Sequence, residues 1–104
     1  MTPAQELFHQ IAAEMPDAKE GKMFGALCIK APNGKAGVMF WRDYMVFKLP
    51  PDALQEALSL DGAQNFDPMD GRPMKEWVQL PYAYSDMWKN YAEHAMAYVA
   101  TLKK

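Results

Sequence analysis

Cysteine is nearly absent from this 104-residue chain, and so is any motif of paired metal ligands. Cys28 is the one cysteine, so a disulfide within the chain and a zinc site built on several thiolates are both excluded. The two histidines, His9 and His94, do not have the His-Glu-x-x-His spacing of a zinc enzyme. We therefore expect neither a metal nor another cofactor. A lone thiol suits a reducing compartment, and we expect the protein to be cytoplasmic.

Long apolar runs and an excess of basic charge are missing as well. No apolar run approaches the roughly 20 residues of a membrane span, and the start of the chain lacks the basic and apolar regions of a secretory signal. The 11 basic and 13 acidic residues give a net charge of -2, whereas binding to a phosphate backbone usually needs a basic surface. The sequence thus predicts no membrane contact and does not favour nucleic acid as a partner.

Catalytic patterns are also lacking. Cys28 falls in the middle of an expected strand, where a free cysteine usually behaves as a small buried hydrophobe. Gly34-Lys35 is not followed by the serine or threonine of a phosphate-binding loop. The aspartates gather at turns, which they stabilise by local hydrogen bonds to the backbone. We expect no catalytic residue and predict that the protein is not an enzyme.

The residues that are present predict one globular domain over residues 1–104. Half of them are hydrophobic and 23% are charged, which is ordinary for a folded domain that builds a core without disulfides. Apolar residues recur at helical spacing after Thr2, after Pro51 and after Ser85, a plausible cap for a long terminal helix. Pro16 should end the first helix near Met15.

Between these helices the sequence predicts strands. Residues 17–22 read as a polar connection, and strands are expected at residues 23–31, around Val38 and Phe40, and at residues 45–49. Residues 64–66 and 74–80 form a further hairpin around a loop over residues 68–73. This order predicts an α+β fold: a curved antiparallel sheet of about five strands, a three-stranded meander plus a hairpin, packed with an N-terminal, a short middle and a long C-terminal helix.

Two turns link the strands of the meander. Asn33-Gly34 between apolar runs is the strongest short-range hairpin signal, because both central residues of a type I′ turn need a positive φ. Arg42-Asp43, between Trp41 and Tyr44, is expected to form a second tight turn.

The meander carries apolar side chains on both faces. Val38 and Phe40 alternate with Met39 and Trp41, and three helices cover one sheet face well but the second only partly. We therefore expect a noncatalytic regulatory or protein-interaction domain that binds a protein partner or a second copy of itself. The expected interaction surface is the aromatic set, which is Trp41, Tyr44 and Trp77.

Two alternatives stay open. The basic set, which is Lys22, Lys30, Lys35 and Arg42, could bind nucleic acid together with neighbouring aromatic rings. The simpler explanation is a solvated sheet edge whose lysines prevent strand-to-strand aggregation. The other alternative is an enzyme or small-ligand binder with a cleft between the sheet and the terminal helix.

Several short motifs occur in a characteristic order: Lys22-Met23-Phe24-Gly25, Gly34-Lys35, Val46-Phe47-Lys48-Leu49-Pro50, Phe66-Asp67-Pro68, Trp77-Val78-Gln79-Leu80-Pro81, and then Trp88 and Ala92. In these motifs the chain resembles the TfoX N-terminal domain family, and its layout is similar to that of the YjbR/MmcQ-like small proteins. The resemblance implies an α+β domain with a curved antiparallel sheet and a link to regulators of natural competence. It implies no catalytic residues, and related proteins have been described as DNA-binding.

Overall fold

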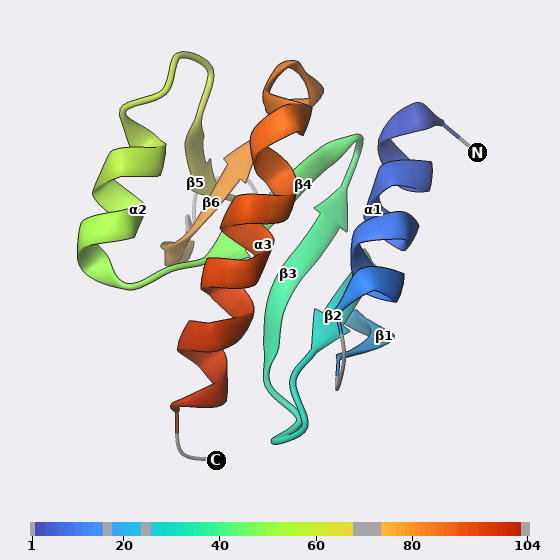
Figure 1. The fold of residues 1–104 in the computed structure, drawn as a ribbon. Coiled ribbons are helices and arrows are strands. Elements are labelled where there is room, and N and C mark those ends of the chain that lie inside the picture. The colour runs from blue at the N-terminus through green and yellow to red at the C-terminus, as the bar shows by residue number, and fades with distance from the viewer. Residues whose placement is uncertain (1, 16–17, 24–25, 68–73, 103–104) are drawn as a thin grey trace.

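The computed structural model describes residues 2–15, 18–23, 26–67 and 74–102. Its elements are α1 (Pro3–Glu14), β1 (Lys19–Met23), β2 (Ala26–Lys30), β3 (Ala36–Trp41), β4 (Tyr44–Lys48), α2 (Pro51–Leu58), β5 (Gln64–Phe66), β6 (Met74–Leu80), the short 3-10 helix η1 (Tyr82–Tyr84) and α3 (Ser85–Ala100). Figure 1 shows α3 in front of the middle strands, with α1 and α2 to either side of it. The predicted α+β fold is confirmed.

Over the described residues the sheet has six strands in the order β1-β2-β3-β4-β6-β5, and each neighbouring pair is antiparallel. The expected number of about five was wrong because residues 19–22, predicted as a polar connection, lie in β1. This strand pairs with β2 from Lys19↔Lys30 to Met23↔Ala26. A strand at the sheet edge is held by backbone hydrogen bonds on one side and needs little apolar side-chain area. The hydrophilic sequence of β1 therefore gave no strand pattern that could be recognised. Phe24 and Gly25, which opened the resemblance motif, lie outside the described residues, as does the expected loop over 68–73.

The tight turn expected at Arg42-Asp43 is confirmed, and it takes the type I′ geometry that was expected at Asn33-Gly34. Arg42 and Asp43 both have positive φ, 49° and 68°, and form the type I′ geometry between the paired residues Trp41 and Tyr44. At the other turn Gly34 has a φ of 85°, but Asn33 is not in the positive-φ region. The prediction of a type I′ turn at Asn33-Gly34 was therefore wrong, although the hairpin itself is confirmed.

Pro32 explains the difference. The Ala31 N–H donates to the Lys35 carbonyl at 2.9 Å and the Gly34 N–H donates to the Ala31 carbonyl at 2.9 Å. Three residues, 32–34, thus form the loop. Pro32 suits the first central position of a type I turn, with Asn33 at the second. Gly34, which follows this turn, takes the left-handed conformation that closes such three-residue loops.

Asn33 ties this turn to the end of the terminal helix. Its side-chain Nδ2 donates to the carbonyls of Val99 at 2.9 Å and Leu102 at 3.1 Å, and its Oδ1 accepts from the Lys35 N–H at 3.0 Å. The last carbonyls of a helix have no partner within the helix. The asparagine donates to one of them, the Val99 carbonyl, and to the Leu102 carbonyl just beyond the helix, and so fixes the end of α3 against the β2–β3 turn.

The helix starts were predicted with mixed success. Thr2 caps α1 as expected, accepting from the Gln5 N–H at 3.2 Å, with Pro3 in the first turn. Ser85 does not cap α3; it is the first residue of that helix and follows η1 directly. Tyr84 instead anchors this entry, because its hydroxyl donates to the Asp61 carbonyl at 2.6 Å.

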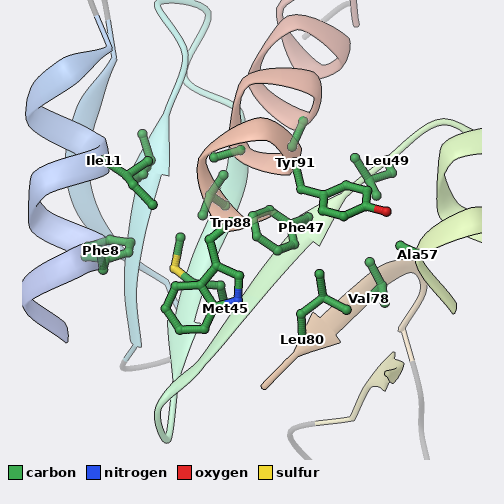
Figure 2. Packing of buried hydrophobic residues seen from close by; sticks show 14 of the residues in the cluster. Phe8, Ile11, Met45, Phe47, Leu49, Ala57, Val78, Leu80, Trp88 and Tyr91 are labelled. Atoms are coloured by element: carbon green, nitrogen blue, oxygen red, sulfur yellow. The ribbon is translucent and has the colours of Figure 1, made fainter. Parts of the chain in front are cut away.

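The main core lies between the three helices and one face of the sheet (Figure 2). Its largest buried side chains include Phe8, Ile11, Met45, Phe47, Leu80 and Trp88. Gly37 lets α3 approach β3 closely. A Cβ on Gly37 would lie 3.0 Å from Met96 Sδ, 3.0 Å from Val99 Cγ2 and 3.1 Å from the Ala95 carbonyl oxygen.

A second, smaller core covers the other face of the sheet. Its buried members are Ala26, Cys28, Met39, Val46, Phe66 and Trp77, all from strands. The Trp41 and Phe66 rings meet edge to face with centroids 5.7 Å apart, although β4 and β6 separate their strands. Three strand spacings in a flat sheet would span about 14 Å. The sheet therefore curves toward this face, and its own aromatic side chains bury the face.

Candidate interaction surface

The aromatic set predicted as an interaction surface belongs largely to this second core. Trp77 is 6% exposed, and Trp41 and Tyr44 are half-buried. Trp41 packs on Phe66, and the Arg42 guanidinium lies 5.1 Å from the centre of its ring. The curvature of the sheet thus withdraws Trp77 from solvent, a consequence that the strand pattern does not reveal.

A different aromatic residue is exposed. Among the described residues, Tyr82 is the large hydrophobic side chain left in solvent, with 45% of its surface accessible. It lies in η1, where its ring packs edge to face on the buried Trp88 at a centroid distance of 5.6 Å. One feature of the sequence could have indicated that Tyr82 is exposed: it directly follows Pro81, the residue after the end of β6.

The basic set does not form one surface. Lys22 lies opposite Leu27, which packs on the main core, so Lys22 is on the helix side of β1. Lys30 shares the opposite face with the buried Cys28. Arg42 lies at the β3–β4 turn, the whole length of β3 away from Lys35.

Lys30 has a different close neighbour, Lys19. The two lysines are directly opposite each other on β2 and β1, and like charges in that arrangement destabilise a strand pair. The Lys30 stem passes over Gly21, whose Cβ, if present, would lie 3.4 Å from Lys30 Cε. In the described part of the chain, neither lysine forms an ion pair.

These lysines line a hollow of about 500 Å³, which we call the basic hollow. Its lining residues are Lys19, Glu20, Gly21, Lys30, Ala31, Pro32 and Gly34.

A second hollow of about 370 Å³ lies where the end of α1, the β2–β3 turn and the C-terminal half of α3 meet. We call it the apolar hollow; its lining residues are Glu14, Met15, Ala18, Ala31, Pro32, Glu93, Met96, Ala97 and Ala100. Glu14 is 3.4 Å from Lys89 Nζ, whereas Glu93 is exposed and forms no ion pair within the described residues.

The predicted cleft between the sheet and the terminal helix is replaced by this hollow beside the helix. At Gly37, α3 packs closely on β3, since an added methyl group would meet three atoms at 3.0–3.1 Å. Sequence reasoning missed the apolar hollow because its lining comes from three separate segments of mostly small residues. None of them stands out as a motif.

The two hollows meet at Ala31 and Pro32, which line both. Together they form what we call the corner surface. It is acidic at Glu14 and Glu93 and basic at Lys19 and Lys30. Glu20 also lines the basic hollow and contacts His9. Ala31 and Pro32, which the two hollows share, are apolar.

The titratable groups near the corner surface do not form a catalytic site. His9 Nδ1 lies 2.7 Å from Glu20 Oε1, the carboxylate–imidazole contact that orients a catalytic histidine. Within the described residues, however, no serine, threonine or cysteine side chain is bonded to His9. Cys28 is fully buried, and burial raises the pKa of its thiol above the usual value despite the opposing effects of Lys30 and the Gly21 N–H. A thiol held neutral is a poor nucleophile.

The described ranges contain neither a cluster of metal-ligand side chains nor a helix that could span a membrane. There, no three His, Cys, Asp or Glu side chains come together as metal ligands. The helices of the same residues are too short or too polar to cross a bilayer.

Comparison with known proteins adds no relative. No family model matches the chain, and no match was found among curated proteins or among solved structures. The resemblance to the TfoX N-terminal domain family therefore stays a prediction from its motifs, and the site must be interpreted from its own geometry.

Proposed function

We propose that this protein is a noncatalytic interaction domain that binds a protein partner at its corner surface. The observation that carries the proposal is the apolar hollow of about 370 Å³, rimmed by Glu14 and Glu93 and lacking a reactive side chain among its lining residues. Binding sites commonly combine an apolar floor with a few polar groups that fix orientation. An apolar side chain flanked by a basic residue fits this hollow.

The lining favours a protein over a rigid small molecule. Met15, the C-cap of α1, and Met96 of α3 both line the hollow, and methionine adapts its shape to varied apolar contacts. The hollow is also continuous with the basic hollow through Ala31 and Pro32. A partner that spans both would meet an acidic, an apolar and a basic region in succession, which a folded protein surface readily complements.

A regulatory role in the cytoplasm completes the proposal. The motifs shared with the TfoX N-terminal domain family support regulation. The one cysteine, Cys28, is unpaired and buried, which suits a reducing compartment.

Nucleic acid is the second candidate, supported by the unpaired lysines Lys19 and Lys30 in the basic hollow. Of the basic set, Lys35 lies beside the same turn, but Lys22 lies on the other face of the sheet and Arg42 at the far end of β3, so the described cations do not follow a phosphate backbone. Titration with single- and double-stranded oligonucleotides at low and moderate salt separates the candidates. We expect no binding at moderate salt, and tight salt-dependent binding would support nucleic acid instead.

The experiment for the protein partner fills the apolar hollow. Ala97 is exposed and lines it, so Ala97→Arg places a large cation there. Gln55→Arg is the matched control, because Gln55 is exposed on α2, outside both hollows. Tagged protein is used to capture partners from a lysate of the source cells, followed by quantitative mass spectrometry.

We expect the same partner proteins with the unmodified chain and with Gln55→Arg, and at least roughly tenfold less with Ala97→Arg, equivalent to about 1.4 kcal/mol of binding. Thermal unfolding of both variants checks that the fold is intact. Equal capture by a folded Ala97→Arg variant would contradict the proposal.

A further inference from the structure

Resting on the proposed function, we infer that one partner of the corner surface is a second copy of this chain, docked about a two-fold axis that passes beside Pro32. In a two-fold dimer each copy presents the same surface, so that surface must be complementary to itself. The corner surface meets this condition through its charges.

The acidic and the basic residues line different hollows, which share Ala31 and Pro32. Glu14 and Glu93 line only the apolar hollow, and Lys19 and Lys30 line only the basic hollow. The one carboxylate among the lining residues of the basic hollow, Glu20, is held by His9, whose Nδ1 lies 2.7 Å from Glu20 Oε1. A half-turn about an axis at Pro32 places the acidic half of one copy over the basic half of the other. Each dimer would then contain two such contacts, related by symmetry.

Unpaired charge supports the same arrangement. Lys19 and Lys30 repel each other across β1 and β2 and, among the described residues, have no acidic partner. Glu93 likewise has no ion pair in that part of the chain. Docking a second copy brings a carboxylate to the lysine pair and thereby relieves a repulsion that the single copy retains.

The centre of the surface is suited to close contact. Pro32 is exposed and Ala31 is buried beneath it. The Asn33 side chain holds this turn against the end of α3. The contact region is therefore rigid before docking, which lowers the entropy lost on association.

The dimer should be weak and sensitive to salt. The chain exposes 6145 Å² in total, and a standard interface would take about 800 Å² of each copy. The corner surface is charged at both ends, so much of its attraction is screened as salt rises. We expect dissociation constants on the order of micromolar to tens of micromolar at low salt.

Sedimentation velocity of the full chain tests the inference, from about 1 µM to about 500 µM, in roughly 50 mM and 500 mM NaCl. We expect the 11.8 kDa chain to move toward a two-copy species as concentration rises, and to do so less at the higher salt. A chain that stays monomeric at every concentration and at both salts would overturn the inference.

Charge reversal then locates the contact. We expect Glu93→Lys and Lys19→Glu each to weaken the dimer by at least about tenfold, equivalent to about 1.4 kcal/mol. Both residues are exposed, so both variants should fold. The double variant Glu93→Lys with Lys19→Glu should recover most of the affinity, because the half-turn again pairs opposite charges. No recovery in the double variant would overturn the proposed axis.

Two further variants act as controls. Lys75→Glu reverses an exposed charge outside both hollows and should leave the dimer unchanged. Lys22→Glu tests pairing through the free edge of β1, since an antiparallel contact centred on Gly21 would join Lys22 to Glu20 of the other copy. Loss of the dimer in Lys22→Glu but not in Lys19→Glu would overturn the corner surface in favour of edge pairing.

Failure of this inference is distinguishable from failure of the proposed function. A monomeric chain whose Ala97→Arg variant loses captured proteins overturns only self-association. If Ala97→Arg affects neither self-association nor capture, the corner surface binds neither a second copy nor another protein, and both proposals fall.

Discussion

On one face of the sheet three helices bury a core of large side chains around Trp88 and Phe47. On the other face the buried cluster of described residues comes from strands, yet Cys28, Met39 and Phe66 are fully buried. The helices bury the first face, whereas the curvature of the sheet buries the second, because it brings Trp41 of β3 onto Phe66 of β5. The number of helices therefore does not determine which sheet face is exposed.

This difference relocates the surface available to a partner. A strand pattern with apolar residues on both sides suggests an open face, but here that face is closed by its own aromatic side chains. The remaining hollows lie at the corner where α1 ends and the β2–β3 turn meets α3. There the ends of the helices and the β2–β3 turn enclose the apolar hollow.

The largest expected effect comes from removing one buried phenylalanine from each face. Phe8 and Phe66 are both fully buried, so Phe8→Ala and Phe66→Ala should each lower the free energy of unfolding by about 3–5 kcal/mol. Urea denaturation measures both changes. A loss below roughly 1 kcal/mol for Phe66→Ala alone would mean that the second face is not a true core.

Closing the space between β3 and α3 should have the next largest effect. In Gly37→Ala the added methyl group meets a backbone carbonyl and two side-chain atoms at 3.0–3.1 Å, and overpacking of this kind costs about 1–3 kcal/mol. Gly21→Ala is the matched control, since its nearest contact is the flexible Lys30 stem at 3.4 Å. Equal unfolding midpoints for the two variants in urea would show that α3 has room to move.

Asn33→Ala should lower the free energy of unfolding by about 1–2 kcal/mol, because it removes the hydrogen bonds to the Val99 and Leu102 carbonyls. Asn33→Asp keeps the acceptor for the Lys35 N–H but loses both donors and adds a negative charge at the helix C-terminus. We therefore expect Asn33→Asp to be at least as destabilised as Asn33→Ala. Hydrogen exchange in the last turn of α3 measures the effect, and unchanged protection in both variants would contradict it.

The pH dependence of stability offers the smallest effect, specific to the second face. Burial raises the pKa of the Cys28 thiol in the folded state, so above about pH 8.5 the unfolded chain loses this proton before the folded one does. The contribution of the Cys28 thiol to the free energy of unfolding is therefore fully present below that pH and decreases as the pH rises toward the folded-state pKa. Urea midpoints between about pH 7 and 9.5 should decline more in the unmodified chain than in Cys28→Ala. Parallel slopes would indicate a solvated thiol.

The sequence was sufficient to predict the fold class, three helices and the meander, because helical periodicity, proline positions and turn residues act locally. It misplaced the type I′ turn, since the effect of Pro32 outweighed the Asn33-Gly34 signal. It also missed β1, whose hydrophilic residues are stabilised by backbone pairing. Neither error changes the fold class, because both concern local backbone geometry.

The candidate site was harder to predict than the fold. Trp77 alternates correctly along its strand, but its burial depends on curvature across the whole sheet, which no single strand encodes. The apolar hollow depends on the relative placement of Met15, Pro32 and Ala97 from three segments. The tie between Asn33 and the end of α3, 66 residues away for Val99, likewise has no local signature.

The most direct test of the account is a dilution series followed by amide NMR on the full chain. Concentration-dependent shifts should appear at the corner surface, including Lys19, Gly34 and Ala97, and be absent from Met39 and Val46 on the second face. Shifts centred on Trp41, Tyr44 and their strand neighbours, with none at the corner, would contradict it.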